Sequence, residues 1–333
     1  MADFAVLLLS RRGDTETDRV RSWLSRTGVP AHRLDADGLD GVDVRVDPDR
    51  GTVTLDGESF TPTVTWIRHF AMRGCAGRGS SDRVMLYRDS WQALVGQLAV
   101  VSRTVIGAAD PGRLEQHAQA RALGIRAPRT LVTTDPASVP RVFASARYVV
   151  KPLDRHYVEP EPGRLAWFHP IVVDAPELAV VPTFAGVPAV VQEYVPHERE
   201  LRVYLVGSQL HAFEVHKSSP QDLWLRPESV RVTAVAVPEP VSTAVRSLAK
   251  AWNLVYGAFD FLIDADGAVF LEVNPHGDWR WFEQRAAGHH RISIATVRLV
   301  HDLHHRYAPA TDTGVLAFLG AFPERRDRPI VVD

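Results

Sequence analysis

Cysteine is nearly absent from this chain, since Cys75 is its one example in 333 residues. A single cysteine excludes an internal disulfide and fits a reducing compartment. Long apolar runs are absent as well, because the stretch from Phe4 to Leu9 is far too short to span a bilayer and has no cleavage site. The formal net charge of −2 gives no argument for binding nucleic acid or a membrane surface. We therefore expect a cytoplasmic protein that binds neither.

The first third of the chain alternates strand and helix patterns. A helix is expected over residues 15–27, where Thr15-x-x-Asp18 resembles a capping box and Gly28 provides the stop. This β-α-β character predicts a small α/β domain of roughly 105 residues. Its other expected elements are a strand at 4–9, a hairpin of 42–46 and 53–55, a strand at 64–67 and a helix at about 82–101.

The rest of the chain carries further strand and helix patterns, without an internal repeat or a low-complexity tract. Residues 154–170 contain Pro160, Pro162 and Gly163 and are expected to be a mobile loop. The tail from about residue 309 has few signals of order. The expected elements are helices at 111–123, 241–253 and 291–305, strands at 148–152 and 187–195, and a hairpin of 201–207 and 210–215.

Three oxygen-bearing side chains stand out on two adjacent predicted strands joined by the turn 264–267. Asp260 lies between two phenylalanines on the first strand, and Glu272 and Asn274 lie on the second. Since side chains alternate along a strand, Glu272 and Asn274 point the same way. The intervening Leu271 and Val273 are expected to point into a core. Two carboxylates and an amide are hard oxygen donors that suit Mg²⁺ held against phosphates. The alternative is a hairpin whose polar residues simply face water.

Two other predicted strands end in polar residues. Lys151 ends the apolar strand at 148–152, where its ammonium either meets a phosphate oxygen or begins a solvated loop. The apolar strand at 187–195 ends in a segment whose backbone N–H and C=O groups can hold an adenine. That segment consists of Gln192, Glu193, Tyr194 and Val195.

Glu200 and Arg202 alternate with apolar residues, so they share one face of a strand. The carboxylate can hold ribose hydroxyls, and the guanidinium can hold a phosphoryl group or an acyl phosphate in fork geometry. Lys217 follows the next hairpin strand and can meet the same anion. The alternative is a surface ion pair between Glu200 and Arg202.

The order of these features resembles the C-terminal half of the ATP-grasp ligase family, over roughly residues 105–300. Within that family the likeness is greatest to the peptide maturases that make graspetides, which are ribosomal peptides with ω-ester or ω-amide side-chain rings, as in microviridins. The segments that carry this likeness are Trp66-Ile-Arg68, Gly124–Thr133, Tyr256–Asp260 and Phe270–Trp281.

The resemblance implies an α/β protein with α+β lobes, an ATP-grasp fold behind an N-terminal pre-ATP-grasp domain. The implied division is an N-terminal domain over residues 1–106, a central lobe over 107–190, a C-terminal lobe with the metal site over 191–308, and a tail over 309–333.

The resemblance also implies roles for individual residues. Lys151 would contact ATP phosphates, Glu200 the ribose, and Arg202 the γ-phosphate and the acyl phosphate. The adenine would be held by the strand end, through the backbone of Glu193 and Tyr194. Mg²⁺ ions would be held by Asp260, Glu272 and Asn274.

Two departures from the family pattern concern the site. Arg113 stands where the family usually places its first ATP lysine, and Gln116-His117 follows where Gln-Leu is common. We expect Arg113 to contact phosphate in place of the lysine. The glycine-rich phosphate loop of many ATP-grasp ligases is also absent from the sequence.

A contiguous Asp-Trp-Arg of the maturases is spread here over Asp222-Leu-Trp-Leu-Arg226. By the resemblance we expect Asp222 to contact the nucleotide. The residues expected to act in catalysis are Arg202, Lys217 and Arg226.

The implied reaction uses ATP and Mg²⁺ to phosphorylate an Asp or Glu side chain of a precursor peptide, which a Ser or Thr hydroxyl or a Lys amine then attacks. The implied partner has a leader and a core rich in acidic and hydroxyl residues, and the enzyme is implied to be a homodimer. Two alternatives stay open: a ligase joining amino acids or small peptides, and a non-catalytic homologue that binds nucleotide or peptide.

Three further features have other interpretations. The run Trp279-Arg-Trp-Phe282 can stack on a bound peptide or pack in a core. Cys75 has no nearby base and is not expected to be a nucleophile. The C-terminal histidines are expected to form a solvated face rather than a zinc site, because no cysteine completes one. They are His289, His290, His301, His304 and His305.

Overall fold

The computed structural model describes residues 3–72, 80–161, 164–180, 184, 186–288 and 290–308. Its contacts divide the chain into two compact units. The first comprises Met1–Phe70, Leu94–Val105 and Ser293–Asp333, and the second comprises Ala71–Ala93 and Ile106–Ile292. Cys75, His289 and the tail from 309 to 333 lie outside the described residues. The finer division into a domain, two lobes and a tail stays a prediction.

The first unit is built on a mixed six-stranded sheet with the order β2-β1-β5-β4-β3, in which β6 also pairs with β5. β1 is buried from Ala5 to Ser10 and runs parallel to β2 and β5, as expected for a strand covered on both faces. The strands are β1 (Asp3–Ser10), β2 (Ala31–Asp35), β3 (Val44–Asp47), β4 (Thr52–Leu55), β5 (Glu58–Ile67) and β6 (Thr104–Ile106). The predicted strands and the β3–β4 hairpin are confirmed, and β5 is longer than expected.

Helix α1 (Thr15–Arg26) confirms the predicted helix but begins differently. Asp14 caps it, because the Asp14 carboxylate accepts hydrogen bonds from the backbone N–H groups of Glu16 and Thr17, both at 3.1 Å. The predicted capping box is therefore wrong, since an earlier side chain already satisfies the first turn. The other long helices of the prediction are present as α2 (Ser81–Gln97), followed by a 3-10 turn (Leu98–Val100), and α8 (Arg291–His305).

The second unit contains two larger antiparallel sheets. The four-stranded sheet has the order β11-β8-β12-β7, and the five-stranded sheet has the order β15-β14-β13-β16-β17. The first consists of β7 (Thr130–Thr133), β8 (Arg147–Pro152), β11 (Ile171–Asp174) and β12 (Ala189–Glu193). The second consists of β13 (Arg199–Val206), β14 (Gln209–His216), β15 (Arg231–Val235), β16 (Tyr256–Asp264) and β17 (Gly267–Asn274).

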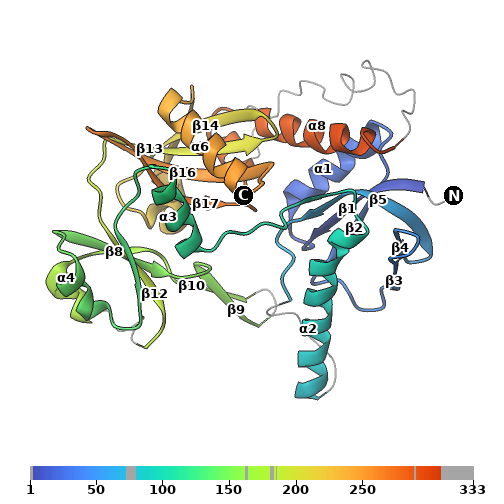
Figure 1. Ribbon diagram of the computed structural model, residues 1–333, viewed down its shortest axis with the longest axis horizontal. Helices are drawn as coiled ribbons and strands as arrows, with labels where there is room; N and C mark the ends of the chain where they lie inside the picture. Colours follow the sequence, from blue (N-terminus) through green and yellow to red (C-terminus); the bar gives the residue numbers. More distant parts are fainter. Residues whose placement is uncertain are drawn as a thin grey trace, which may run out of the picture. The chain divides into compact units, whose positions relative to one another are not determined.

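Helices α3 (Arg113–Ala122) and α6 (Glu239–Ala251) pack on the five-stranded sheet (Figure 1). Residues at helical spacing on α6, including Val241, Val245 and Leu248, are fully buried against Phe259 and Phe270 of the sheet. This core holds β16 and β17 rigidly beneath the site. Short helices complete the unit: α4 (Val139–Val142), α5 (Asp222–Leu225) and α7 (Arg280–Arg285).

Within residues 154–170, the segments 157–161 and 164–167 are strands rather than part of the expected loop. β9 (Tyr157–Glu161) and β10 (Arg164–Trp167) form a two-stranded antiparallel sheet of their own. Tyr157 pairs with Trp167 across it, and the two ring centroids lie 5.3 Å apart. An aromatic cross-strand pair favours a sheet, and an isolated strand pair tolerates Pro160 because it has open edges.

Candidate functional site

Arg202, Asp260 and Glu272 lie side by side on three neighbouring strands of the five-stranded sheet. The register pairs Arg202 on β13 with Asp260 on β16, and Asp260 with Glu272 on β17. Directly opposed residues of antiparallel strands project from the same face within contact distance. Arg202 Nη1 accordingly donates to Asp260 Oδ2 at 2.8 Å.

A β-bulge in β17 changes which side chains face the site. Asp260 pairs with Glu272, but the next pair is Phe261 with Phe270, so Leu271 is an extra residue. Phe270 is fully buried in the core, whereas Leu271 lines a pocket together with Glu272. The expectation that Leu271 points into a core is therefore wrong, because the bulge interrupts the alternation on which it rested.

The Glu272 carboxylate meets two cations from other elements. Lys151 Nζ, near the end of β8, donates to Glu272 Oε2 at 2.7 Å, and the Arg113 guanidinium pairs with the same oxygen. Gln116 fixes α3 for this contact: its Oε1 accepts from Val273 N at 2.9 Å, and its Nε2 donates to Val273 O at 3.1 Å. The Gln116 amide thus makes the two backbone hydrogen bonds that a neighbouring strand would make at the edge of β17. Arg113 lies one helical turn before Gln116 and is thereby placed opposite Glu272.

The two carboxylates of this row differ in protonation behaviour. Burial raises the pKa of Asp260 to about 6, although Arg202 opposes the effect. Burial also favours the neutral form of Glu272, but Arg113 and Lys151 outweigh it and hold the pKa of Glu272 well below its ordinary value. Burial lowers the pKa of Lys151, and the adjacent Glu272 carboxylate opposes that change. Of the two carboxylates, Glu272 therefore has the lower pKa, because it faces two cations.

Glu200, two residues before Arg202 on β13, has partners of its own. Lys217 Nζ pairs with Glu200 Oε2, and His197 Nε2 lies 3.2 Å from Glu200 Oε1. Burial raises the pKa of Glu200, but His197 and Lys217 outweigh burial, so this pKa lies below its ordinary value. The alternative of a surface ion pair between Glu200 and Arg202 is wrong, since each is paired with another residue.

Two half-buried histidines lie beside these cations and were missed by sequence reasoning. Burial, with the nearby Lys151 and Arg113, lowers the pKa of His117 to about 4. Burial also lowers the pKa of His156 to about 4, against the effect of Glu272. Both are therefore neutral at physiological pH. The position of His117 on α3, one residue after Gln116, was the available signal for one of them.

Gln192, at the end of β12, is buried and belongs to the same region. Its Nε2 lies 2.9 Å from both His117 Nε2 and Thr130 Oγ1. Since a neutral histidine accepts at one ring nitrogen, the Gln192 amide can donate to His117. This contact ties the end of β12 to α3.

The next two residues of this strand end have their backbone amides engaged. The Glu193 N–H donates to Arg129 O at 3.0 Å, and the Tyr194 N–H donates to Arg147 O at 2.9 Å. The Arg147 guanidinium also lies over the Tyr194 ring, 4.0 Å from its centroid. The backbone donor expected for an adenine is therefore not supplied by the N–H groups of Glu193 or Tyr194.

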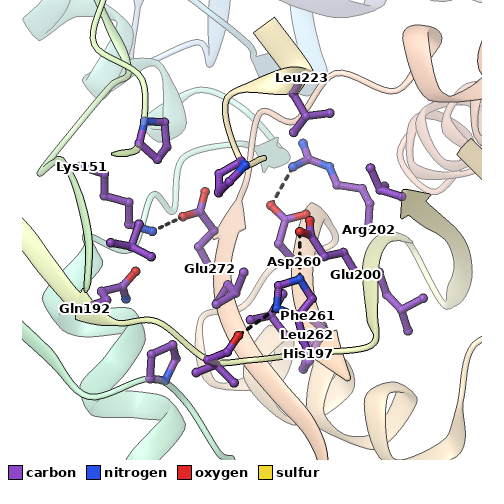
Figure 2. Close-up of a pocket in the computed structure, with 18 of the residues that line it drawn as sticks. Lys151, Gln192, His197, Glu200, Arg202, Leu223, Asp260, Phe261, Leu262 and Glu272 are labelled. Atoms are coloured by element: carbon purple, nitrogen blue, oxygen red, sulfur yellow. Dashed lines mark hydrogen bonds and ion pairs between the residues drawn. The ribbon is translucent and has the colours of Figure 1, made fainter. Parts of the chain in front are cut away.

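A pocket in the second unit gathers most of the predicted site residues (Figure 2). In the close-up, Lys151 points toward Glu272, and Arg202 toward Asp260, from different strands. The predicted residues that line the pocket are Lys151, Gln192, Glu193, Tyr194, Val195, Glu200, Arg202, Lys217, Asp260 and Glu272. Apolar walls that sequence reasoning missed come from Val149, Leu223, Leu262 and Leu271.

Four predicted residues do not line this pocket. Arg113 reaches it through its ion pair with Glu272. Asn274 is exposed, and its Oδ1 accepts from His276 N at 2.9 Å. Asp222 accepts from Ser218 N and Ser219 N at 3.1 and 2.9 Å. It also accepts from Arg226 Nη2 at 2.7 Å, so the spread Asp-Trp-Arg segment forms an ion pair that stabilises a turn.

The aromatic run separates into two roles. Trp279 is buried at 1 % exposure and packs edge-on against Tyr256, with ring centroids 5.7 Å apart. Phe282 lines the pocket, and the Arg202 guanidinium lies 5.2 Å from its ring centroid. Trp279 therefore packs in the core, while Phe282 forms part of the pocket wall. Phe282 contributes a cation–π contact to Arg202.

The donors of the pocket fit Mg²⁺ and a polyphosphate. Asp260 and Glu272 present carboxylate oxygens, and Arg113, Lys151 and Arg202 present cations of the kind that bind phosphate. Mg²⁺ is commonly held by one or two carboxylates together with phosphate oxygens of the substrate. The described residues accordingly contain no group of three or more His, Cys, Asp or Glu arranged to hold a metal by themselves.

The described C-terminal histidines, His290, His301, His304 and His305, belong to no group of three or more His, Cys, Asp or Glu that could hold a metal ion. His304 is buried rather than solvated, and its Nδ1 lies 2.7 Å from Thr63 Oγ1. The expected solvated face is wrong for this residue. No helix among the described residues is long and apolar enough to cross a membrane.

We compared the chain with known proteins to find structures that share its fold. No protein-family model matches the chain, and no curated protein matches it. Solved structures do match. A Chryseobacterium gregarium RiPP-associated ATP-grasp ligase, in complex with ADP and a leader and core peptide, matches with a TM-score of 0.74 and 20% identity, over 91% of this chain and 97% of that one.

Two further structures match as well. The ATP-grasp ligase PsnB, complexed with a phosphomimetic variant of a minimal precursor, Mg and ADP, has a TM-score of 0.72 and 20% identity, over 91% of this chain and 100% of that one. The macrocyclase MdnC, bound with the precursor peptide MdnA from Microcystis aeruginosa, has a TM-score of 0.71 and 21% identity, over 89% of this chain and 100% of that one. This chain has the α/β fold of the ATP-grasp ligases.

Proposed function

We propose that this protein is an ATP-dependent ligase that activates Asp or Glu side chains of a ribosomal precursor peptide and closes ω-ester or ω-amide rings. The observation that carries the proposal is the row of Arg202, Asp260 and Glu272, with Lys151 and Arg113 on Glu272. Carboxylates for a divalent cation and cations for phosphate are here interleaved at one pocket.

The chain's own residues would divide the work as follows. Asp260 and Glu272 would hold Mg²⁺, and Arg113 and Lys151 would hold phosphate oxygens. Arg202 is placed to hold the transferred phosphoryl group, because its guanidinium is fixed by Asp260 and by the Phe282 ring. Bound Mg²⁺ supplies neutralisation of the phosphate charge. Glu200, held by Lys217, would hold the ribose.

The reaction balances as two displacements. A peptide carboxylate oxygen takes the γ-phosphoryl group of ATP, and ADP leaves. A hydroxyl or amine then attacks the acyl carbon, the acyl–oxygen bond to phosphate breaks, and phosphate leaves with the nucleophile's proton as hydrogen phosphate. Electrostatic stabilisation by the fixed cations and positioning in the pocket supply the acceleration. Asn274, Asp222 and Arg226 stay proposed site residues, and the geometry gives them weaker support because they do not line the pocket.

A peptide substrate is supported by what the matching proteins bind. MdnC was solved with a precursor peptide, and the Chryseobacterium ligase with a leader and core peptide. This chain spans 97% to 100% of those chains. We extend the same partner class to this protein, together with a homodimeric state and a cytoplasmic location.

The test uses purified protein, Mg-ATP and a candidate peptide with a leader and an acidic, hydroxyl-rich core. We expect release of ADP and phosphate and a loss of about one water mass per ring formed, measured by mass spectrometry. A protein that leaves such peptides unmodified but ligates free amino acids is instead a small-substrate ligase. A protein that binds nucleotide and releases no ADP with either substrate is a non-catalytic homologue.

A further inference from the structure

His197 lines the pocket and has no part in the chemistry proposed above. It lies between β12 and β13, and its side chain is 19% exposed. Its Nδ1 lies 2.8 Å from Val195 O, and its Nε2 lies 3.2 Å from Glu200 Oε1 (Figure 2). The ring therefore bridges the strand end expected to hold a base and the carboxylate expected to hold a ribose.

The partners of His197 determine its protonation state. A carbonyl oxygen and a carboxylate oxygen only accept hydrogen bonds, so both ring nitrogens must carry hydrogen to satisfy them. Only the imidazolium does so. Glu200 does not supply the hydrogen instead, because Lys217 Nζ pairs with its other carboxylate oxygen and favours the ionised form.

The surroundings of the ring favour the charged form. The titratable and charged groups that face it are Glu200 on β13, Lys217 after β14, and Tyr194 at the end of β12, with ring centroids 6.2 Å apart. The hydrogen bond with Glu200 raises the pKa of His197 above its ordinary 6.5, and burial and Lys217 oppose this only in part.

We propose that His197 is a positioning residue for nucleotide binding, which as an imidazolium holds Glu200 in register with the base-binding strand end. The inference rests on the proposed function, because that function assigns the ribose to Glu200. Without the ring proton, one of the two oxygens faces a nitrogen lone pair, so the ring no longer ties Glu200 to the strand end at Val195. A ligand that engages Glu200 therefore binds the protonated protein better.

Linkage gives the direction of the pH effect. Nucleotide binding fixes Glu200 against the ring, so it raises the His197 pKa further, and affinity falls as pH rises through that pKa. This pH dependence of affinity requires the ribose hydroxyls, because they are the groups that Glu200 is proposed to bind. The ratio of affinities for ADP and for 2′,3′-dideoxy-ADP isolates it, because the phosphates of the two ligands titrate alike and cancel.

The experiment measures this ratio by calorimetry, with Mg²⁺ present, over pH values on both sides of the His197 pKa. In the wild type we expect the preference for ADP to fall about fivefold to tenfold as pH rises, the size of one ordinary hydrogen bond. H197Q should show the reduced preference at every pH. H197R, which keeps a charge and several donors, should retain the preference without the pH dependence.

His216 provides the matched control. It ends β14, the strand paired with the Glu200-bearing β13, its Nε2 lies 3.1 Å from the Glu214 carboxylate, and it does not line the pocket. In H216Q, the preference for ADP over 2′,3′-dideoxy-ADP should therefore change with pH as it does in the wild type. A wild-type ratio that does not change with pH, or an H197Q ratio equal to the wild type, overturns the role of His197 alone. A wild-type protein that binds neither nucleotide overturns the proposed function as well.

Discussion

Two regions of this molecule contain clustered cation–carboxylate pairs, and they differ in exposure. In the first unit, Arg68 pairs with Asp14 at 3.0 Å and with Glu16, and the three side chains are 1%, 6% and 7% exposed. In the pocket of the second unit, Arg202 and Asp260 are 16% and 24% exposed. The first cluster is closed off from solvent, whereas the second borders a cavity.

The hydrogen bonds of the two regions explain this difference. The Asp14 carboxylate accepts from Ser10 Oγ and Thr17 Oγ1, both at 2.6 Å, besides capping α1. Burial raises the pKa of Asp14, but Arg68 and these hydroxyls outweigh it and hold that pKa below its ordinary value. Asp260 is not stabilised to this extent, and its pKa is raised. An arginine–aspartate pair whose hydrogen-bonding groups all have protein partners stabilises the fold. A pair of the same kind that borders a pocket can exchange its protein partner for a ligand.

The largest expected effect is on the closed cluster. Arg68→Met leaves two buried carboxylates without their cation, which should cost about 3–5 kcal/mol of unfolding free energy. Denaturant titration measures it. Arg45→Met is the control, because Arg45 is 69% exposed and pairs with an exposed aspartate, so little change is expected. A loss in Arg68→Met no larger than in the control would show that the closed cluster does not stabilise the fold.

The corresponding change in the pocket should affect activity more than stability. Glu272→Gln removes a proposed metal-binding charge, and we expect turnover to fall roughly 10²–10³-fold. The stability loss should be smaller than in Arg68→Met, because Lys151 and Arg113 can be hydrated from the pocket. Release of ADP measures the rate. Glu214→Gln, whose carboxylate pairs with Arg199 outside the pocket, is the control. Turnover that survives in Glu272→Gln contradicts the metal assignment.

A steric change at the pocket's support should have an intermediate effect. A Cβ on Gly277 would lie 2.4 Å from Ala258 Cβ and 3.1 Å from Arg202 Nη2. Gly277→Ala should therefore cost about 1–3 kcal/mol through overpacking and displace the guanidinium, which lowers turnover. Gly96→Ala, with no atom within 4 Å of its added Cβ, should do neither. Thermal melts and ADP release together check the prediction, and wild-type values for both contradict it.

The effect expected to be smallest at neutral pH is a titration in the first unit, which appears only as the pH is lowered. Burial, with His305 and His301 nearby, lowers the pKa of His304 from 6.5 to about 4. Thr63 Oγ1 donates to Ala5 O, so it accepts from His304 Nδ1, which therefore carries a hydrogen in the folded protein. The unfolded chain takes up the proton first, so stability should fall as pH drops from about 6.5 toward 4. His304→Gln should reduce this slope in pH-dependent melts, and an unchanged slope excludes His304 as its source.

Sequence patterns were sufficient where local rules decide the structure. The strands around Asp260 and Glu272 and the turn between them follow from apolar alternation and turn residues. Helix α6 follows from its apolar spacing. Errors arose where pairing between strands outweighed a local signal, as in the β9–β10 sheet, which a cross-strand aromatic pair favours.

The sequence by itself determined the chemical types present: oxygen donors for a hard cation, cations for phosphate, and an apolar strand end for a base. Only the tertiary structure decided which of them meet. Strand register placed Arg202, Asp260 and Glu272 in one row, and the Gln116 amide on the edge of β17 placed Arg113 against Glu272. These pairings join residues far apart in the chain. They depend on register and helix docking, which local spacing does not encode.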